Sequence, residues 1–76
     1  MNVERMVEMV NDIANFFASE PDHSAAIAGV ASHLKRYWEP RMRKQIVEHL
    51  ATGGHGLSDL GREGVQELAR IQKAAA

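Results

Sequence analysis

Two Glu-Pro pairs and one Gly-Gly pair interrupt the sequence, and these breaks constrain the fold more than any other feature. Glu20-Pro21 and Glu39-Pro40 end helical patterns, because the residue before a proline disfavours the α region. Gly53-Gly54 supplies the left-handed backbone with which many helices end. No segment shows the alternating pattern of a strand. The sequence therefore predicts an all-α protein, a small bundle of three to four helices with corners marked by proline.

The expected helices cover about residues 3–19, 22–37, 40–52 and 59–73. Asn2 is the expected N-cap of the first helix, with a hydrophobic staple between Met1 and Met6, and Ser58 is the expected N-cap of the last. Gly61 and Gly64 should weaken the last helix by roughly 1 kcal/mol each relative to alanine. We therefore expect the last helix to be the least stable of the four unless a partner holds it.

The second helix contains the small residues Ala25, Ala26, Ala28 and Gly29, which favour a close approach of another helix. Its inward-facing residues are expected to be Ala26 or Ile27, Val30, Ala31, Leu34, and either Tyr37 or Trp38. In the first helix, Met9 and Phe16 lie one heptad apart and extend the apolar surface beyond the main stripe. The combined apolar surface is wider than one neighbouring helix would cover.

The chain has 76 residues and no cysteine. We expect one helical domain over residues 1–76, with the last few residues frayed. A domain of this size buries only roughly 60% of the surface that its unfolded chain exposes. Because disulfides and thiolate zinc sites are excluded, stability must come from packing and from association with a partner. The N-terminus lacks the apolar core of a signal peptide and no stretch is long enough to span a membrane, so a cytoplasmic protein is expected.

The net charge of −1 hides a strong division along the chain. Residues 1–22 contain five acidic residues and one basic residue, a net charge of −4. Residues 23–50 contain five basic residues and two acidic ones, a net charge of +3. Opposite charges on two parts of one surface suit docking to a protein better than binding to a polyanion.

No residue pattern points to catalysis or to a cofactor. The four histidines, His23, His33, His49 and His55, include no pair three or four residues apart, so no metal site is expected. The serines and Thr52 are more simply explained as helix-end or surface residues than as nucleophiles. Gly53-Gly54-His55-Gly56 lacks the strand and the Gly-Lys-Ser/Thr of a phosphate-binding loop. We therefore predict no catalytic, cofactor-binding or metal-binding residue in this chain.

The segment from Lys35 to Lys44 holds five of the nine basic residues together with Tyr37 and Trp38. One interpretation is a helix corner with Trp38 in the core and solvated cations around it. The other is a protein-binding patch, because Trp and Arg are enriched at interface hot spots. The predicted partner-binding residues are Arg36, Tyr37, Trp38, Arg41, Arg43 and Lys44. Trp38 would either anchor the contact or fix the corner, and nucleic-acid binding is disfavoured by the acidic first helix and the negative net charge.

Three segments resemble the delta subunit of cytosolic NAD-dependent formate dehydrogenase. They are Phe16-Phe17-Ala18-Ser19-Glu20-Pro21-Asp22, Ala28-Gly29-Val30-Ala31-Ser32-His33-Leu34 and, most specifically, Arg36-Tyr37-Trp38-Glu39-Pro40-Arg41-Met42-Arg43. The resemblance runs from Val3 to about Leu60 and is loose beyond it. Tyr37 and Glu39 stand where the family is expected to have Phe and Asp at least as often.

The resemblance implies an accessory subunit, without catalytic activity, of a complex that oxidises formate to carbon dioxide and reduces NAD. The complex would hold molybdopterin, iron-sulfur clusters, FMN and NAD on its other subunits and none in this chain. The expected partner is the catalytic (alpha) subunit, on which this chain would support quaternary structure or assembly. The alternative function is a small helical regulator that binds nucleic acid or pairs with itself through Met9 and Phe16 as a homodimer.

Overall fold

The helices of this protein begin and end close to the breaks in its sequence. The computed structural model describes residues 2–75. It contains α1 (Val3–Phe17), α2 (His23–Tyr37), α3 (Pro40–Ala51) and α4 (Asp59–Ala75). No strand occurs within these residues, so the predicted all-α bundle is confirmed with four helices. The hydrophobic staple and the frayed C-terminus remain predictions, since Met1 and Ala76 lie outside the described residues.

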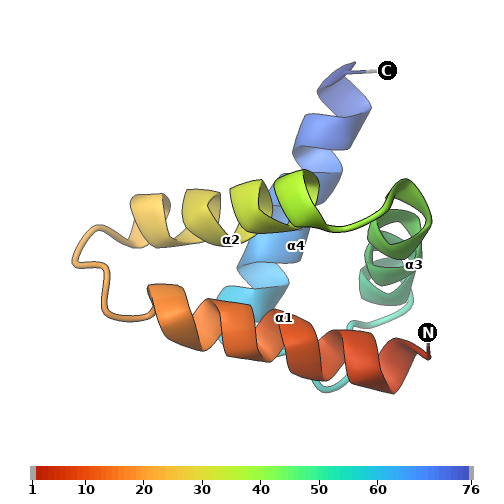
Figure 1. Ribbon diagram of the computed structural model, residues 1–76, viewed down its shortest axis with the longest axis horizontal. Helices are drawn as coiled ribbons and strands as arrows, with labels where there is room; N and C mark the ends of the chain where they lie inside the picture. The colour runs from red at the N-terminus through yellow and green to blue at the C-terminus, as the bar shows by residue number, and fades with distance from the viewer. Residues whose placement is uncertain (1, 76) are drawn as a thin grey trace.

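Helices α1 and α2 form a pair, and α3 and α4 pack against it. Figure 1 shows α1 and α2 lying side by side and running in opposite directions. α3 stands at the end of the pair where α1 begins and α2 ends, and α4 crosses behind the pair at a steep angle. The most extensive contact between helices joins α2 to α4. The corner between α2 and α3 therefore lies at the opposite end of α2 from the turn between α1 and α2.

Side chains cap three of the four helix starts. Asn2 Oδ1 accepts a hydrogen bond from the amide of Arg5 at 2.8 Å, and Ser58 Oγ accepts one from Gly61 at 3.1 Å, as predicted. Asp22 caps α2 by accepting from the amide of Ser24 at 3.0 Å. α3 starts at Pro40, whose missing N–H needs no partner at this position. Polar side chains thus define the same boundaries that the sequence pattern indicates.

The predicted glycine end of α3 is confirmed. The amide of Gly54 donates to the carbonyl of His49 at 2.9 Å, and the amide of Gly53 donates to Leu50 at 3.1 Å. This pair of bonds is a Schellman motif, which requires positive φ after the last helical residues. Gly53 and Gly54 have φ values of 122° and 63°. α1 ends two residues earlier than predicted, because the chain leaves the helix in a turn in which Glu20 donates to the carbonyl of Phe17 at 3.0 Å.

The core lies where all four helices meet. Its fully buried large side chains are Met6, Val10, Val30, Leu34, Ile46, Val65 and Leu68. Of the two aromatic residues left open in α2, Trp38 joins the core with 7% of its surface exposed, whereas Tyr37 is 66% exposed. Ala26 is buried rather than Ile27, which is only half-buried. Val65 was not predicted, because sequence spacing alone does not fix how α4 is rotated.

The glycines of α4 lie at its closest contacts with other helices. A Cβ atom on Gly64 would stand 2.3 Å from Val30 Cγ1, and one on Gly61 would stand 3.2 Å from Val10 Cγ1. Glycine therefore lets α4 approach α2 and α1 more closely than alanine would. The expectation that α4 is the least stable helix considered only the propensity cost and omitted this packing.

Candidate partner-binding surface

The corner between α2 and α3 is built around a buried tryptophan. Trp38 ends α2 with an extended backbone, and its amide donates to the carbonyl of Leu34 at 3.0 Å. Its side chain packs into the core, and Pro40 starts the next helix two residues later. A buried indole next to a proline restricts the direction in which α3 leaves α2. Of the two predicted roles of Trp38, the fold therefore favours fixing the corner.

Arg43 joins the two helices across this corner. Its Nη1 donates to the carbonyl of Lys35 at 3.0 Å, which satisfies a carbonyl in the last turn of α2. The side chain is half-buried, and its Nε is buried without a hydrogen-bond partner among residues 2–75. A guanidinium held in this way is only partly available to another protein. The sequence did not reveal this role, because it depends on how α3 is placed against the end of α2.

Four other cations around the corner are exposed: Lys35, Arg36, Arg41 and Lys44, which we call the basic corner. Within the described part of the chain, none of their side chains makes a hydrogen bond or an ion pair. By contrast, Arg5 pairs with Glu8 at 3.2 Å, and Arg62 donates to the carbonyl of Gly54 at 3.1 Å. The basic corner is therefore a group of cations that the fold itself does not neutralise.

An aromatic groove lies between α1 and α2. It has a volume of about 640 Å³ and is lined by Asp12, Ile13, Phe16, Phe17, His33 and Tyr37. Phe16 is 77% exposed and Tyr37 is 66% exposed. These two are the exposed large hydrophobic side chains among the described residues. We call this feature the aromatic groove.

The predicted residues therefore fall into three groups. Arg36, Tyr37, Arg41 and Lys44 are exposed, Arg43 is half-buried, and Trp38 is buried. The two residues of the predicted second stripe on α1 also differ in burial: Met9 packs against the core, whereas Phe16 faces solvent. Sequence analysis missed Ile13 and His33 as neighbours of Phe16 and Tyr37. The pattern gave no signal for them, because the antiparallel pairing of α1 and α2 determines which residues share the groove.

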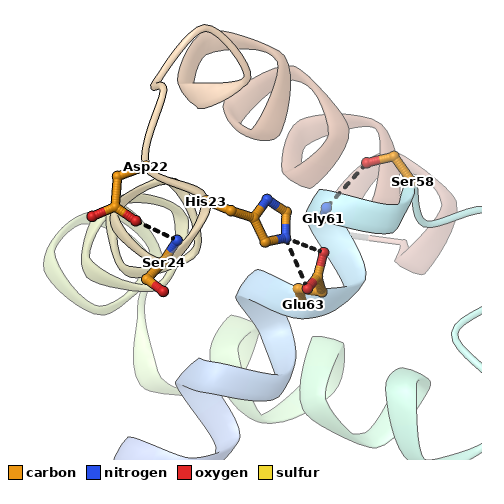
Figure 2. A network of polar contacts seen from close by, with 6 residues as sticks. All are labelled: Asp22, His23, Ser24, Ser58, Gly61 and Glu63. Atoms are coloured by element: carbon orange, nitrogen blue, oxygen red, sulfur yellow. Dashed lines mark hydrogen bonds and ion pairs between the residues drawn. The ribbon is translucent and has the colours of Figure 1, made fainter.

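The other polar contacts connect secondary structure. Figure 2 shows His23 Nε2 facing the carboxylate of Glu63, with both oxygens at 3.0 Å, so that the start of α2 is joined to α4. His49 Nε2 donates to the carbonyl of His55 at 2.8 Å. Across residues 2–75, no group of three His, Asp or Glu side chains could hold a metal ion.

The hydrogen bond from Arg70 lowers the pKa of the Glu67 carboxyl on the surface of α4.

The loop before α4 is fixed by side chains from other elements. The Asn11 side chain donates from Nδ2 to the carbonyl of Gly56 at 3.0 Å and accepts at Oδ1 from the amide of Ser58 at 2.9 Å. Both contacts span more than forty residues of sequence.

None of the helices within residues 2–75 is both long enough and apolar enough to cross a membrane.

Comparison with known proteins identifies the family. The sequence matches the family model of the NADH-dependent formate dehydrogenase delta subunit, FdsD, over residues 5–65. This range covers α1 from Arg5 onward, all of α2 and α3 and the first part of α4, and so includes both the basic corner and the aromatic groove. No match was found among the curated proteins or the solved structures that were compared. The match extends over most of the chain, and this protein therefore belongs to the family of delta subunits of NADH-dependent formate dehydrogenases.

Proposed function

We propose that this chain is a non-catalytic accessory subunit that docks on the catalytic (alpha) subunit of its formate dehydrogenase complex through the basic corner. Membership of the delta-subunit family implies that other subunits of the complex are its partners. Docking on the alpha subunit, in support of quaternary structure or assembly, is our assignment. The observation that carries it is the set of four exposed cations without partners in the described chain.

Charge and geometry support this role for the corner. Isolated surface cations contribute little to a fold, so a cluster of them on a rigid support is explained better by an external partner than by stability. Arg36 and Arg41 can form paired hydrogen bonds with carboxylates, and Lys44 adds a mobile charge. Trp38 and Arg43 hold the two helix ends that present these cations. The backbone that carries the four cations is therefore fixed before a partner arrives.

The chemistry of the side chains supports a role without catalysis. The chain contains no cysteine and so supplies no thiolate to an iron-sulfur cluster. His23 and His49 are engaged in contacts that join structural elements. We propose that molybdopterin, iron-sulfur clusters, FMN and NAD are bound by the other subunits. The part played by this chain is then to position or stabilise those subunits.

Charge reversal at the corner tests the proposal. The complex is co-expressed with a tagged copy of this chain that carries Arg41→Glu and Lys44→Glu, and the catalytic subunit recovered at moderate salt is measured. Lys73→Glu is the control, since Lys73 is an exposed cation in the last turn of α4 and not part of the basic corner. Arg43 is left unchanged because its loss would also open the corner.

We expect the double variant to recover at least tenfold less catalytic subunit, while the Lys73→Glu variant recovers the wild-type amount. Helical content measured by circular dichroism should be the same for all three proteins. Equal recovery by the double variant and the control would show that the corner does not carry docking.

A further inference from the structure

Each exposed aromatic side chain of the groove is held in place by a second aromatic ring. Phe16 contacts Phe17 edge to face, with ring centroids 5.1 Å apart and planes at 88°. Tyr37 lies against the ring of His33, with centroids 4.8 Å apart. Such contacts restrict the rotamers of side chains that solvent would otherwise leave mobile. The groove thus presents two large rings whose ordering cost on binding is already reduced.

Gly29 makes room for the ring at the base of the groove. A Cβ atom at this position would stand 2.5 Å from two ring carbons of Phe17, so the ring lies directly on the backbone of α2. Phe17 remains only half-buried in this position, and Phe16 beside it stays exposed. The arrangement therefore leaves apolar surface open to solvent instead of closing α1 fully onto α2.

The groove continues along α2 to Lys35 and Arg36, the two cations of the basic corner that lie on this helix. Phe17, His33 and Tyr37 also line a second hollow, which Arg36 and Ser32 complete together with Gly29. A third hollow is lined by Ser32, Lys35 and Arg36. Shared lining residues make these hollows one continuous face, apolar at the α1 side and cationic at the C-terminal end of α2. A ligand that fills the groove is therefore within reach of Arg36.

We infer that the aromatic groove receives an amphipathic helix of a partner subunit, with apolar side chains between Phe16 and Tyr37 and carboxylates along the edge that faces Arg36. This inference rests on the proposed function and adds the apolar half of the same interface. A groove between two helices fits a third helix, whose anchors recur every three or four residues. Tyr is enriched at the hot spots that dominate binding energy, and Phe is enriched in the buried centres of interfaces.

Charge balance favours such a partner over a second copy of this chain. The groove itself offers one carboxylate, Asp12, whereas the adjoining hollows are lined by two cations of the basic corner, Lys35 and Arg36. On α1, Glu8 is already paired with Arg5. Two copies meeting at this face would therefore bring cations together in excess, and like charges in contact disfavour association. An acidic helix neutralises the same cations.

The size of the surface leads to the same choice. A stable interface covers roughly 800 Å² on each partner, which is about a sixth of the 4897 Å² surface of this chain. The exposed rings of Phe16 and Tyr37 supply only part of that area. The adjoining hollows lined by Ser32, Lys35 and Arg36 can supply more of that area to a partner that is both apolar and acidic.

Variants in the groove and photo-crosslinking test this inference together. Phe16→Ala and Tyr37→Ala remove exposed rings, while Ile27→Ala removes a half-buried apolar side chain from a different hollow and serves as control. Each variant is co-expressed with the other formate dehydrogenase subunits, and the recovered catalytic subunit is measured. In parallel, p-benzoylphenylalanine is placed at position 16 of the full chain within the assembled complex, and its crosslinked peptide is identified by mass spectrometry.

We expect at least tenfold lower recovery with either aromatic variant, unchanged recovery with the control, and a crosslink to a helical segment of a partner subunit with several carboxylates. Normal recovery with both aromatic variants, or a crosslink to a second copy of this chain, would overturn the inference. Failure of the wild-type chain to recover any other subunit would instead overturn the proposed function. The two failures are therefore distinguishable.

Discussion

Alanine at Gly64 tests whether α4 crosses α2 at the distance that the structure gives. A Cβ atom at position 64 would lie 2.3 Å from Val30 Cγ1 and 2.7 Å from Val30 Cβ. Ordinary carbon contacts are roughly 3.5–4.0 Å, so the two helices would have to separate by more than about 1 Å. Val30 is fully buried and, as a β-branched residue in a helix, has one strongly preferred rotamer. Its side chain therefore cannot swing away.

The expected change in stability is the difference between two effects. Extra volume in a packed core costs about 1–3 kcal/mol, whereas replacing glycine by alanine within a helix gains about 1 kcal/mol. Because the clash is with a buried β-branched side chain, we expect a net loss of about 2 kcal/mol. A chain of this length is stable by only about 4–11 kcal/mol, and each kcal/mol shifts its midpoint by about 4–8 °C. The Gly64→Ala variant should therefore melt about 8–16 °C below wild type.

A double-mutant cycle separates this clash from other effects. Val30→Ala alone leaves a cavity and is expected to cost about 2 kcal/mol. In the Gly64→Ala/Val30→Ala protein the new methyl group occupies part of that space. The free energies of unfolding, measured by urea titration followed by circular dichroism, should show the double variant at least 1 kcal/mol more stable than the sum of the single losses predicts. A Gly64→Ala protein as stable as wild type, with additive losses in the cycle, would refute the close crossing.

Substitutions at three further positions test other parts of the fold. Trp38→Ala should cost about 3–5 kcal/mol in urea titrations, while Trp38→Phe should retain most of the stability; equal losses for both would contradict a packing role. Ser58→Ala should lower the free energy of unfolding by about 1 kcal/mol through loss of the α4 cap, and Ser58→Asp should restore it. The lowered pKa of Glu67 means that its pair with Arg70 stabilises the fold above the ordinary carboxyl pKa of 4.5 and loses this effect as pH falls through the lowered value. Glu67→Gln should therefore be less stable than wild type at neutral pH and equal to it in acid, and a difference that persists at low pH would argue against the ion pair.

The helix boundaries could be predicted from sequence because local chemistry sets them. Asn2, Ser58, Pro40 and Gly53 act within one helical turn of their own position, and the structure places each at the predicted helix end. The sequence pattern left open whether Trp38 or Tyr37 faces the core, since adjacent residues differ by about 100° around a helix and either can point inward. Tertiary packing resolved that choice in favour of Trp38.

The role of Gly64 and the composition of the candidate site depend on contacts between distant segments. From sequence alone, Gly64 predicts only a less stable helix. The position of Val30 on another helix explains why glycine stands there. The hydrogen bond of Arg43 likewise depends on the angle of the corner. The basic corner was predictable as a cluster of charges, whereas the aromatic groove required the pairing of α1 with α2.

We propose that this chain docks on the catalytic subunit of a formate dehydrogenase complex. The most direct measurement is size-exclusion chromatography of the complex purified through a tag on this chain, with the ratio of subunits quantified across the peak. We predict that the chain elutes with the catalytic subunit at a constant ratio, and that the ratio falls in the Arg41→Glu/Lys44→Glu variant. Elution of the wild-type chain as a separate small peak, free of the catalytic subunit, would contradict this account.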